Sequence, residues 1–136
     1  MAVQIPGLRL DGASGGLGNL PWRPTRYPGV EWLDLVPEAE PEEKGSPKAA
    51  TQTVLIRMAP GSGYPTHRHL GPEDVLVLAG GYRDDDGRTF RAGEFVRYPA
   101  GSEHSPVALE GDSPVSEACV LFAVAHGGTV VVTPDS

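Results

Sequence analysis

Three of the four histidines and one glutamate are spaced like the ligands of a single metal ion. One residue separates His67 from His69, Glu73 follows closely, and His104 comes later in the chain. Alternate side chains of an extended strand share a face, so His67 and His69 can bind the same ion. Neutral imidazoles with a carboxylate suit iron, manganese, nickel or zinc. We therefore predict that these four residues bind one divalent ion per chain, with iron or zinc favoured.

One neighbouring carboxylate competes for a place in this set, and the fourth histidine lies outside it. Asp74 adjoins Glu73, and the loop at residues 70–72 decides which carboxylate turns inward, but the spacing favours Glu73. His126 precedes two glycines and is predicted to lie in a turn or at the surface. The predicted ligands include no thiolate, whereas closed structural zinc sites are usually rich in cysteine. We therefore expect a site with exchangeable positions, which permits catalysis.

The elements that must position these residues are predicted to be strands. A chain of 136 residues fits one domain, and its composition of 39% apolar and 21% charged residues is that of an ordinary globular protein. No stretch has a sustained helical period with caps, so few or no helices are expected. About ten short strands favour an all-β jelly roll of two packed sheets. We expect an irregular arm over residues 1–28 and a β-barrel domain over residues 29–136.

The pattern of apolar residues and turn signals locates individual elements. Predicted strands cover residues 30–36, 51–58, 64–69, 74–79, 115–125 and 129–133. Asp84, Asp85 and Asp86 precede Gly87 and predict a hairpin turn, because the ligand register and distal glutamate of a calcium loop are missing. Residues 37–50 are rich in glutamate and proline and are expected to form a solvated loop.

Two aromatic residues indicate that the N-terminal arm packs against something. Side chains as large as Trp22 and Tyr27 usually bury their area, either on the barrel or on a neighbouring subunit. Cys119 lies in an apolar run and is predicted to be a buried core thiol. As the only cysteine, it permits no disulfide within the chain.

The spacing of the predicted ligands resembles the two signature motifs of the cupin superfamily. The first motif is matched at Gly61, His67, His69, Glu73 and Gly80, and the second at Gly93, Pro99, Gly101 and His104. Cupins often carry an asparagine four residues after the last histidine, where this chain has Ala108. Because that position is not a usual ligand, the departure concerns local packing rather than metal binding. The resemblance implies a cupin jelly-roll β-barrel and favours pairing of the arm with a second subunit in a homodimer.

Within the superfamily, residues 67–106 resemble the ChrR-like cupins, and this resemblance implies two classes of function. One is a metal-dependent, dioxygenase-like oxidoreductase, in which iron(II) would bind a small substrate such as a diketone or aromatic ketone. The alternative is a non-catalytic, zinc-binding sensor or regulatory cupin. Anti-sigma factors of this subgroup carry a separate helical, sigma-binding domain, and we expect no counterpart of it in this chain.

A third alternative is a sugar isomerase or epimerase. Cupins of that kind tend to add a lysine or glutamate base to the metal ligands. Lys44 and Lys48 lie in the acidic loop, which argues against a buried lysine base.

Candidate catalytic residues are polar side chains close in sequence to the ligands. Tyr64, Arg57 and Tyr98 are candidates for contact with a bound anion or enolate, and Arg97 is a fourth. An arginine in an apolar strand needs a partner or solvent, so Arg57 lies either in the interior or on the outer face. Glu103 is expected to point away from the site, or else to orient an imidazole.

The charge balance bears on partners and location. A net charge of −7 with scattered basic residues argues against nucleic acid and against an anionic membrane surface. The N-terminal residues show no basic segment followed by an apolar one, so no secretory signal is expected. We therefore expect a cytoplasmic protein whose partner is a small-molecule substrate or ligand.

Overall fold

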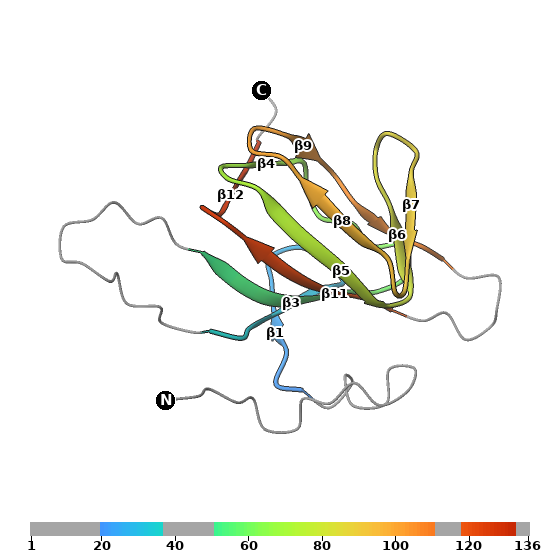
Figure 1. The fold of residues 1–136 in the computed structure, drawn as a ribbon. Coiled ribbons are helices and arrows are strands. Elements are labelled where there is room, and N and C mark those ends of the chain that lie inside the picture. The colour runs from blue at the N-terminus through green and yellow to red at the C-terminus, as the bar shows by residue number, and fades with distance from the viewer. Residues whose placement is uncertain (1–19, 37–50, 111–117, 133–136) are drawn as a thin grey trace.

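The computed structural model describes residues 20–36, 51–110 and 118–132 as a barrel of β-strands (Figure 1). Twelve strands are assigned within these ranges, in three antiparallel sheets, and none of the described residues is helical. The prediction of an all-β jelly roll is therefore confirmed. No described segment forms a helix long and apolar enough to cross a membrane.

The largest sheet has six strands. In spatial order they are β1 (Arg23–Pro24), β2 (Val30–Asp34), β3 (Gln52–Met58), β11 (Cys119–Ala125), β5 (Glu73–Ala79) and β8 (Phe95–Tyr98). The central strands β3, β5 and β11 are the longest in the sheet, at seven residues each. They form the stable wall against which the smaller sheets pack.

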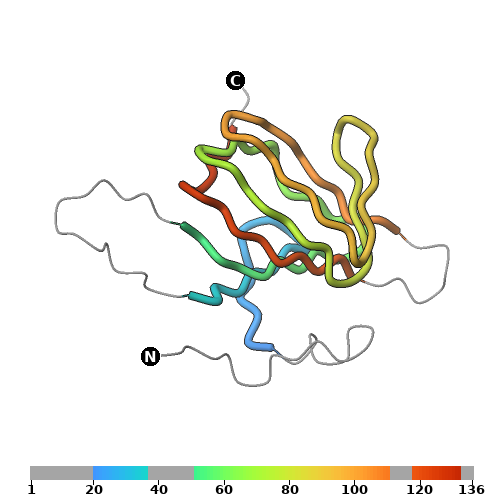
Figure 2. Tube along the Cα trace, viewed as in Figure 1, coloured from blue at the N-terminus to red at the C-terminus, as the bar shows by residue number. Residues whose placement is uncertain are grey.

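Two smaller sheets of three strands each complete the barrel. One contains β10 (Val107–Ala108), β6 (Gly81–Arg83) and β7 (Thr89–Arg91), and the other contains β12 (Thr129–Val131), β4 (His67–His69) and β9 (Glu103–His104). Figure 2 shows the green, orange and red segments that carry β4, β9 and β12 meeting at one end of the molecule. Segments far apart in sequence are therefore neighbours at that end.

Strand alternation divides the apolar residues of the six-stranded sheet between two faces. In β3, Val54 and Met58 join an interior core, whereas the intervening Leu55 joins an outer core. The buried members of the interior core are Val30, Val54, Met58, Val75, Val77, Tyr82, Tyr98, Ala108, Cys119, Leu121 and Ala123. The buried members of the outer core are Leu20, Leu33, Leu55, Ala79 and Val120.

The described end of the N-terminal arm packs on its own barrel. Leu20 and Trp22 cover the outer core, and Tyr27 meets the ring of Tyr64 edge-on at 5.0 Å between centroids. Both aromatic residues are partly buried, as expected, and their contacts within this chain are with the barrel. The short strand β1 pairs with β2 and ties the arm to the sheet. Residues 1–19 and the predicted loop at 37–50 lie outside the described residues.

Most predicted strands agree with the structure to within about two residues. The strand expected at 64–69 is shorter, because residues 64–66 form no strand ladder and only Gly63 bridges to Val107. The predicted closing strand is described from Cys119 onward, and its residues 115–117 lie outside the described ranges. Cys119 is fully buried, which confirms the prediction of a core thiol, and burial raises its pKa to about 12.

Candidate metal centre

Strand β4 supplies two inward-facing imidazoles. His67 and His69 are buried, while Arg68 between them is exposed and lies 4.0 Å from Glu103 on the outside. This is the alternation expected of a strand with one face toward the interior. β4 is also the middle strand of its sheet, held by β9 on one side and β12 on the other. Its backbone, and hence the direction of both imidazoles, is fixed from both edges.

The third imidazole comes from the neighbouring strand β9. The pairing register places His104 directly opposite His67, and their ring centroids are 4.4 Å apart. The turn before β9 is anchored to β4, because Gly101 donates its backbone N–H to the carbonyl oxygen of His69 at 2.7 Å. Gly101 has a φ of 86°, a left-handed conformation that favours glycine. The turn that carries His104 is thereby locked to the strand that carries the other two histidines.

Glu73 reaches the site from the six-stranded sheet. It is the first residue of β5, and the loop before it passes very close to another backbone segment. A Cβ atom on Gly71 would lie 1.7 Å from the carbonyl oxygen of His126, so only glycine fits there. Glu73 is buried, whereas Asp74 faces outward to Arg97 and His126. The structure thus turns Glu73 inward, as its spacing predicts.

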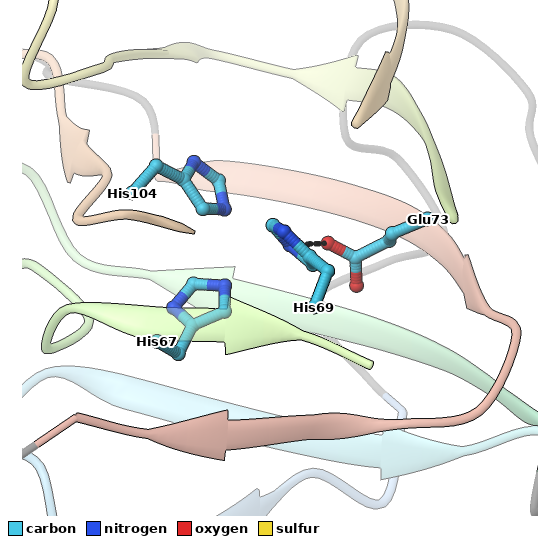
Figure 3. A group of neighbouring side chains, drawn as sticks. All are labelled: His67, His69, Glu73 and His104. Carbon is cyan, nitrogen blue, oxygen red and sulfur yellow. Dashed lines mark hydrogen bonds and ion pairs between the residues drawn. The ribbon is translucent and has the colours of Figure 1, made fainter. Parts of the chain in front are cut away.

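The four side chains converge on one point (Figure 3). Their ligand atoms all lie within 4.8 Å of one another, and all four residues are buried. Metal–ligand bonds of about 2.1 Å separate opposite ligands by about 4.2 Å, so a shift of a few tenths of an ångström would close the set around an ion. Among the described residues this is the one group of such side chains with that geometry.

All three imidazoles present the same ring nitrogen to the centre, because each Nδ1 already has an acceptor. The acceptors are the carbonyl oxygen of Pro65 for His67 at 3.0 Å, the carbonyl and hydroxyl oxygens of Ser102 for His69 at 3.1 and 3.0 Å, and Oδ1 of Asp84 for His104 at 2.8 Å. An Nδ1–H in each ring leaves the Nε2 lone pair for a metal.

Two observations show that this donor set fits a metal. Nε2 of His104 is buried and has no hydrogen-bond partner among the described residues, which is costly unless an ion occupies the centre. Nε2 of His69 lies 2.9 Å from Oε1 of Glu73, close to the roughly 3 Å expected between adjacent ligands of an octahedral ion. Without a metal, this contact requires one proton between the two atoms. Metal binding would replace that proton.

His67 is held in its metal-binding protonation state. Burial lowers its pKa to about 4, and the neighbouring His104 and His69 act in the same direction. The ring is therefore neutral at neutral pH, as a ligand must be. Its edge faces the ring of Tyr64, with 5.1 Å between centroids.

Asp84 is the functional residue that the sequence interpretation missed. The predicted hairpin turn is present, with the Gly87 N–H donating to the Asp84 carbonyl oxygen at 2.9 Å. The Asp84 side chain nevertheless points inward and is only 3% exposed, unlike the exposed Asp85 and Asp86. The signal was the period of two from Tyr82, since Asp84 directly follows the last residue of β6 and, like Tyr82, is buried while Arg83 between them is exposed.

The candidate catalytic residues occupy very different places. Tyr64 lines the interior cavity beside His67. Tyr98 is buried and stacks on His69 at 5.1 Å, but its hydroxyl donates to Asp84 and contacts the hydroxyl of Tyr82. Burial and these contacts raise the Tyr98 pKa, so the phenol stays protonated. Of the two tyrosines, Tyr64 is the one whose place suits contact with a substrate.

Both candidate arginines lie on the outer surface of the barrel. Arg57 donates from Nε to Glu31 at 2.9 Å and stacks over the ring of Trp22 at 4.7 Å. Arg97 forms an ion pair with Asp74 at 3.0 Å and is mostly exposed. Neither arginine lines the cavity beside the metal ligands. Of the two positions considered for Arg57, the structure shows the outer one.

The remaining acidic and imidazole side chains named from the sequence also lie away from the centre. Glu103 is exposed beside Arg68, and the acidic residue that contacts an imidazole Nδ1 is Asp84. His126 lies in a turn, as predicted, at 3.3 Å from Asp74. Ala108, at the position where cupins often carry asparagine, is buried in the interior core, where its small side chain fits.

An apolar cavity adjoins the centre. Besides His67, Glu73 and His104 it is lined chiefly by Trp32, Ile56, Met58, Val75, Leu121 and Ala123. The space that the centres of water molecules can occupy in it is about 40 Å³, so the cavity holds only a few water-sized groups. No arginine or lysine lines it in the described part of the chain. Lys44 and Lys48 lie outside the described residues.

Comparisons with solved structures agree with this architecture. A chain in the complex of Rhodobacter sphaeroides SigE with the anti-sigma ChrR matches at 29% identity and a TM-score of 0.60; the match covers 80% of this protein and half of that chain. The polyketide cyclase RemF from Streptomyces resistomycificus matches at 18% identity and a TM-score of 0.63, over 88% and 84% of the two chains. An acetylacetone dioxygenase from Acinetobacter johnsonii matches at 18% identity and a TM-score of 0.53, over 72% and 60%.

The comparison with protein families covers most of the chain. No curated protein matches the sequence. The model of the ChrR cupin-like domain, however, matches residues 14–128, a range that contains all four converging side chains. Together with the barrel and its two motifs, this match shows that the chain belongs to the ChrR cupin-like domain family.

Proposed function

We propose that this protein is a mononuclear metal-dependent oxidoreductase of the dioxygenase type that acts on a small organic substrate. The observation that carries the proposal is the convergence of three Nε2 atoms and one carboxylate at the wall of an apolar cavity. The residues that would hold the ion are His67, His69, Glu73 and His104. Iron(II) bound there would supply Lewis-acid and redox chemistry toward the substrate and dioxygen.

The chemistry of the ligand set supports an open site. Closed structural zinc sites are usually rich in cysteine, whereas this set has three imidazoles and one carboxylate, which would leave about two positions free on an octahedral ion. The four side chains come from β4, β5 and β9, and the cavity adjoins them. A substrate entering the cavity would therefore lie against the open side of the ion.

The charge of the site favours a particular kind of substrate. A divalent ion with one carboxylate ligand has a net charge of about +1, and no arginine or lysine among the described lining residues adds to it. The apolar walls disfavour a group with several charges, such as a phosphate. The site therefore suits a compact molecule that binds as a monoanion, and of the two substrate classes the enolate of a small β-diketone fits the cavity better than that of an aromatic ketone. Tyr64 would orient it from the cavity wall.

Oxygen uptake tests the proposal directly. The protein would be purified without chelator or affinity metal, loaded anaerobically with iron(II), and mixed with a panel of diketones and aromatic ketones in an oxygen electrode. We expect uptake that needs both iron and substrate, and none for His104→Ala. Absence of uptake across the panel, with iron shown to be bound by elemental analysis, would contradict the oxidative function.

The family match favours a second candidate, a zinc-binding sensor or regulatory domain. The solved relative at 29% identity comes from a complex between a sigma factor and an anti-sigma factor. On this hypothesis the protein would retain zinc on purification, show no turnover, and release zinc when an oxidant attacks the site. A chromophoric chelator reports such release. Zinc retained after oxidant treatment would count against the sensor.

The isomerase alternative has less support. Neither lysine of the chain lies within the described residues, and Glu73 is the one carboxylate among the described residues that line the cavity. Homodimer formation stays a prediction from the cupin resemblance. Light scattering on the purified protein would measure it.

A further inference from the structure

A buried chain of hydrogen bonds extends outward from the metal ligand His104. Asp84 accepts the Nδ1–H of His104 at Oδ1, over 2.8 Å, and accepts the hydroxyl proton of Tyr98 at Oδ2, over 2.7 Å. The hydroxyls of Tyr98 and Tyr82 lie 2.6 Å apart. None of these four residues is more than 6% exposed, so the chain is shielded from water.

The hydrogen bonds of this network converge on Asp84 from both sides. Tyr98 uses its only hydroxyl proton on Asp84, so the hydrogen bond between the tyrosines must be donated by Tyr82. Every donor therefore points toward the Asp84 carboxylate. Tyr82 also lines the cavity, which connects the wall of the cavity to the metal ligand through three hydrogen bonds.

We propose that Asp84 is the positioning residue of the metal centre, holding His104 in the Nδ1–H tautomer with Nε2 directed at the ion, and that Tyr98 and Tyr82 hold Asp84 in turn. The proposal rests on the metal site proposed above. A carboxylate that accepts the distal N–H of a ligating histidine fixes the ring orientation and makes the ring a stronger donor.

The three histidines differ in how they are held, which makes Asp84 the decisive case. His67 and His69 donate to neutral oxygens of Pro65 and Ser102, whereas His104 donates to a carboxylate. A hydrogen bond to an ionised acceptor is roughly twice as strong as one between neutral groups. Nε2 of His104 is also fully buried and has no hydrogen-bond partner in the described structure, so the direction of this ring depends strongly on Nδ1.

The amino-acid sequence offers a matched control residue directly beside Asp84. Asp85 follows Asp84 directly and is exposed, so Asp85→Asn makes the same chemical change outside the network. Asp84→Asn keeps the shape of the side chain but removes its charge. Tyr98→Phe removes only the second bond to Asp84.

The test measures zinc affinity by competition with a chromophoric chelator, and the visible spectrum of the cobalt(II)-loaded protein. We expect Asp84→Asn to weaken zinc binding by about 10–100-fold and to change the cobalt spectrum. Asp85→Asn should match the wild type, and Tyr98→Phe should fall between them. Wild-type affinity and an unchanged spectrum in Asp84→Asn would overturn the proposal. If Asp84→Asn does not fold, Tyr98→Phe decides, and wild-type behaviour there would overturn it.

A second measurement separates this inference from the proposed function. Nitrogen NMR of the metal-free protein reports the tautomer of His104 without any metal. We expect an Nδ1–H ring in the wild type and a mixture of tautomers in Asp84→Ala. The same tautomer in both would overturn the positioning role. If the wild type binds no metal yet shows this Asp84-dependent tautomer, the proposed function fails while the role of Asp84 stands.

Discussion

The two faces of the six-stranded sheet differ in chemistry, although the same strands supply both. The inner face carries the interior core, and Glu73 at the start of β5 joins the imidazoles at its edge. The outer face carries Leu55 and Val120 under the arm, with Arg57 paired to Glu31 at its surface. Polar groups on the inner face are buried and mutually oriented, whereas those on the outer face contact solvent. The inner face should therefore control metal binding and the outer face stability alone.

Removal of an inner-face ligand should have the largest effect. We expect His69→Ala to weaken metal binding by more than the roughly 100-fold upper limit for residues around the ligands, because a metal bond itself is lost. Chelator competition measures the affinity. His126→Ala is the matched control, since His126 lies in a turn outside the set. Equal losses in both variants would contradict the assignment of His69.

Truncation of an outer-core residue should separate stability from metal binding. Leu55 is 1% exposed, so Leu55→Ala should lower the free energy of unfolding by about 2–5 kcal/mol through lost burial and a new cavity. Urea denaturation in the presence of chelator measures this change. Metal affinity of the folded variant should remain at the wild-type value. A weakened affinity would show that the two faces are coupled.

The pH dependence of the metal-free protein reports on the inner face. Burial lowers the pKa of His67 from 6.5 to about 4. At a pH between these two values, the His67 imidazole is therefore protonated in the unfolded protein but neutral in the folded protein. Stability should be full above pH 6.5 and fall toward pH 4, by at most about 3 kcal/mol from this residue. Denaturation at several pH values, compared with His67→Gln, isolates the contribution. The same slope in both proteins would argue against it.

The ion pair on the outer face should matter least. Arg57 and Glu31 are partly exposed, and such pairs contribute about 0.2–1 kcal/mol. Arg57→Met, which keeps an apolar stem against Trp22, should therefore lower the free energy of unfolding by about 1 kcal/mol or less and leave metal affinity unchanged. Thermal denaturation and chelator competition measure the two quantities. A loss of metal affinity would place Arg57 in the site after all.

Local patterns predicted much of the fold. The apolar residues at 52–58 and at 119–125 predict one strand in each range, with both faces buried. Glycine and proline between the short apolar runs predict the turns. Strand alternation brings His67 and His69 to one face. These features depend on neighbours in sequence, so the sequence alone contains them.

The roles of individual polar residues depended on tertiary contacts. Tyr98 and Arg57 are equally plausible in sequence, yet one lies in the buried network and the other on the outer surface. The residues around Asp84 have the sequence pattern of a turn. Only the position of β9 in the folded protein brings Nδ1 of His104 to 2.8 Å from Oδ1 of Asp84.

The sequence by itself determined the type and spacing of the candidate metal ligands and the strands that carry them, because strand alternation and turn chemistry are local. The tertiary structure decided which nitrogen each histidine presents, which carboxylate turns inward and which polar groups stay in solvent. Those outcomes follow from the pairing of β4 with β9 and of β5 with β11 and β8, strands distant in sequence whose register no local pattern specifies.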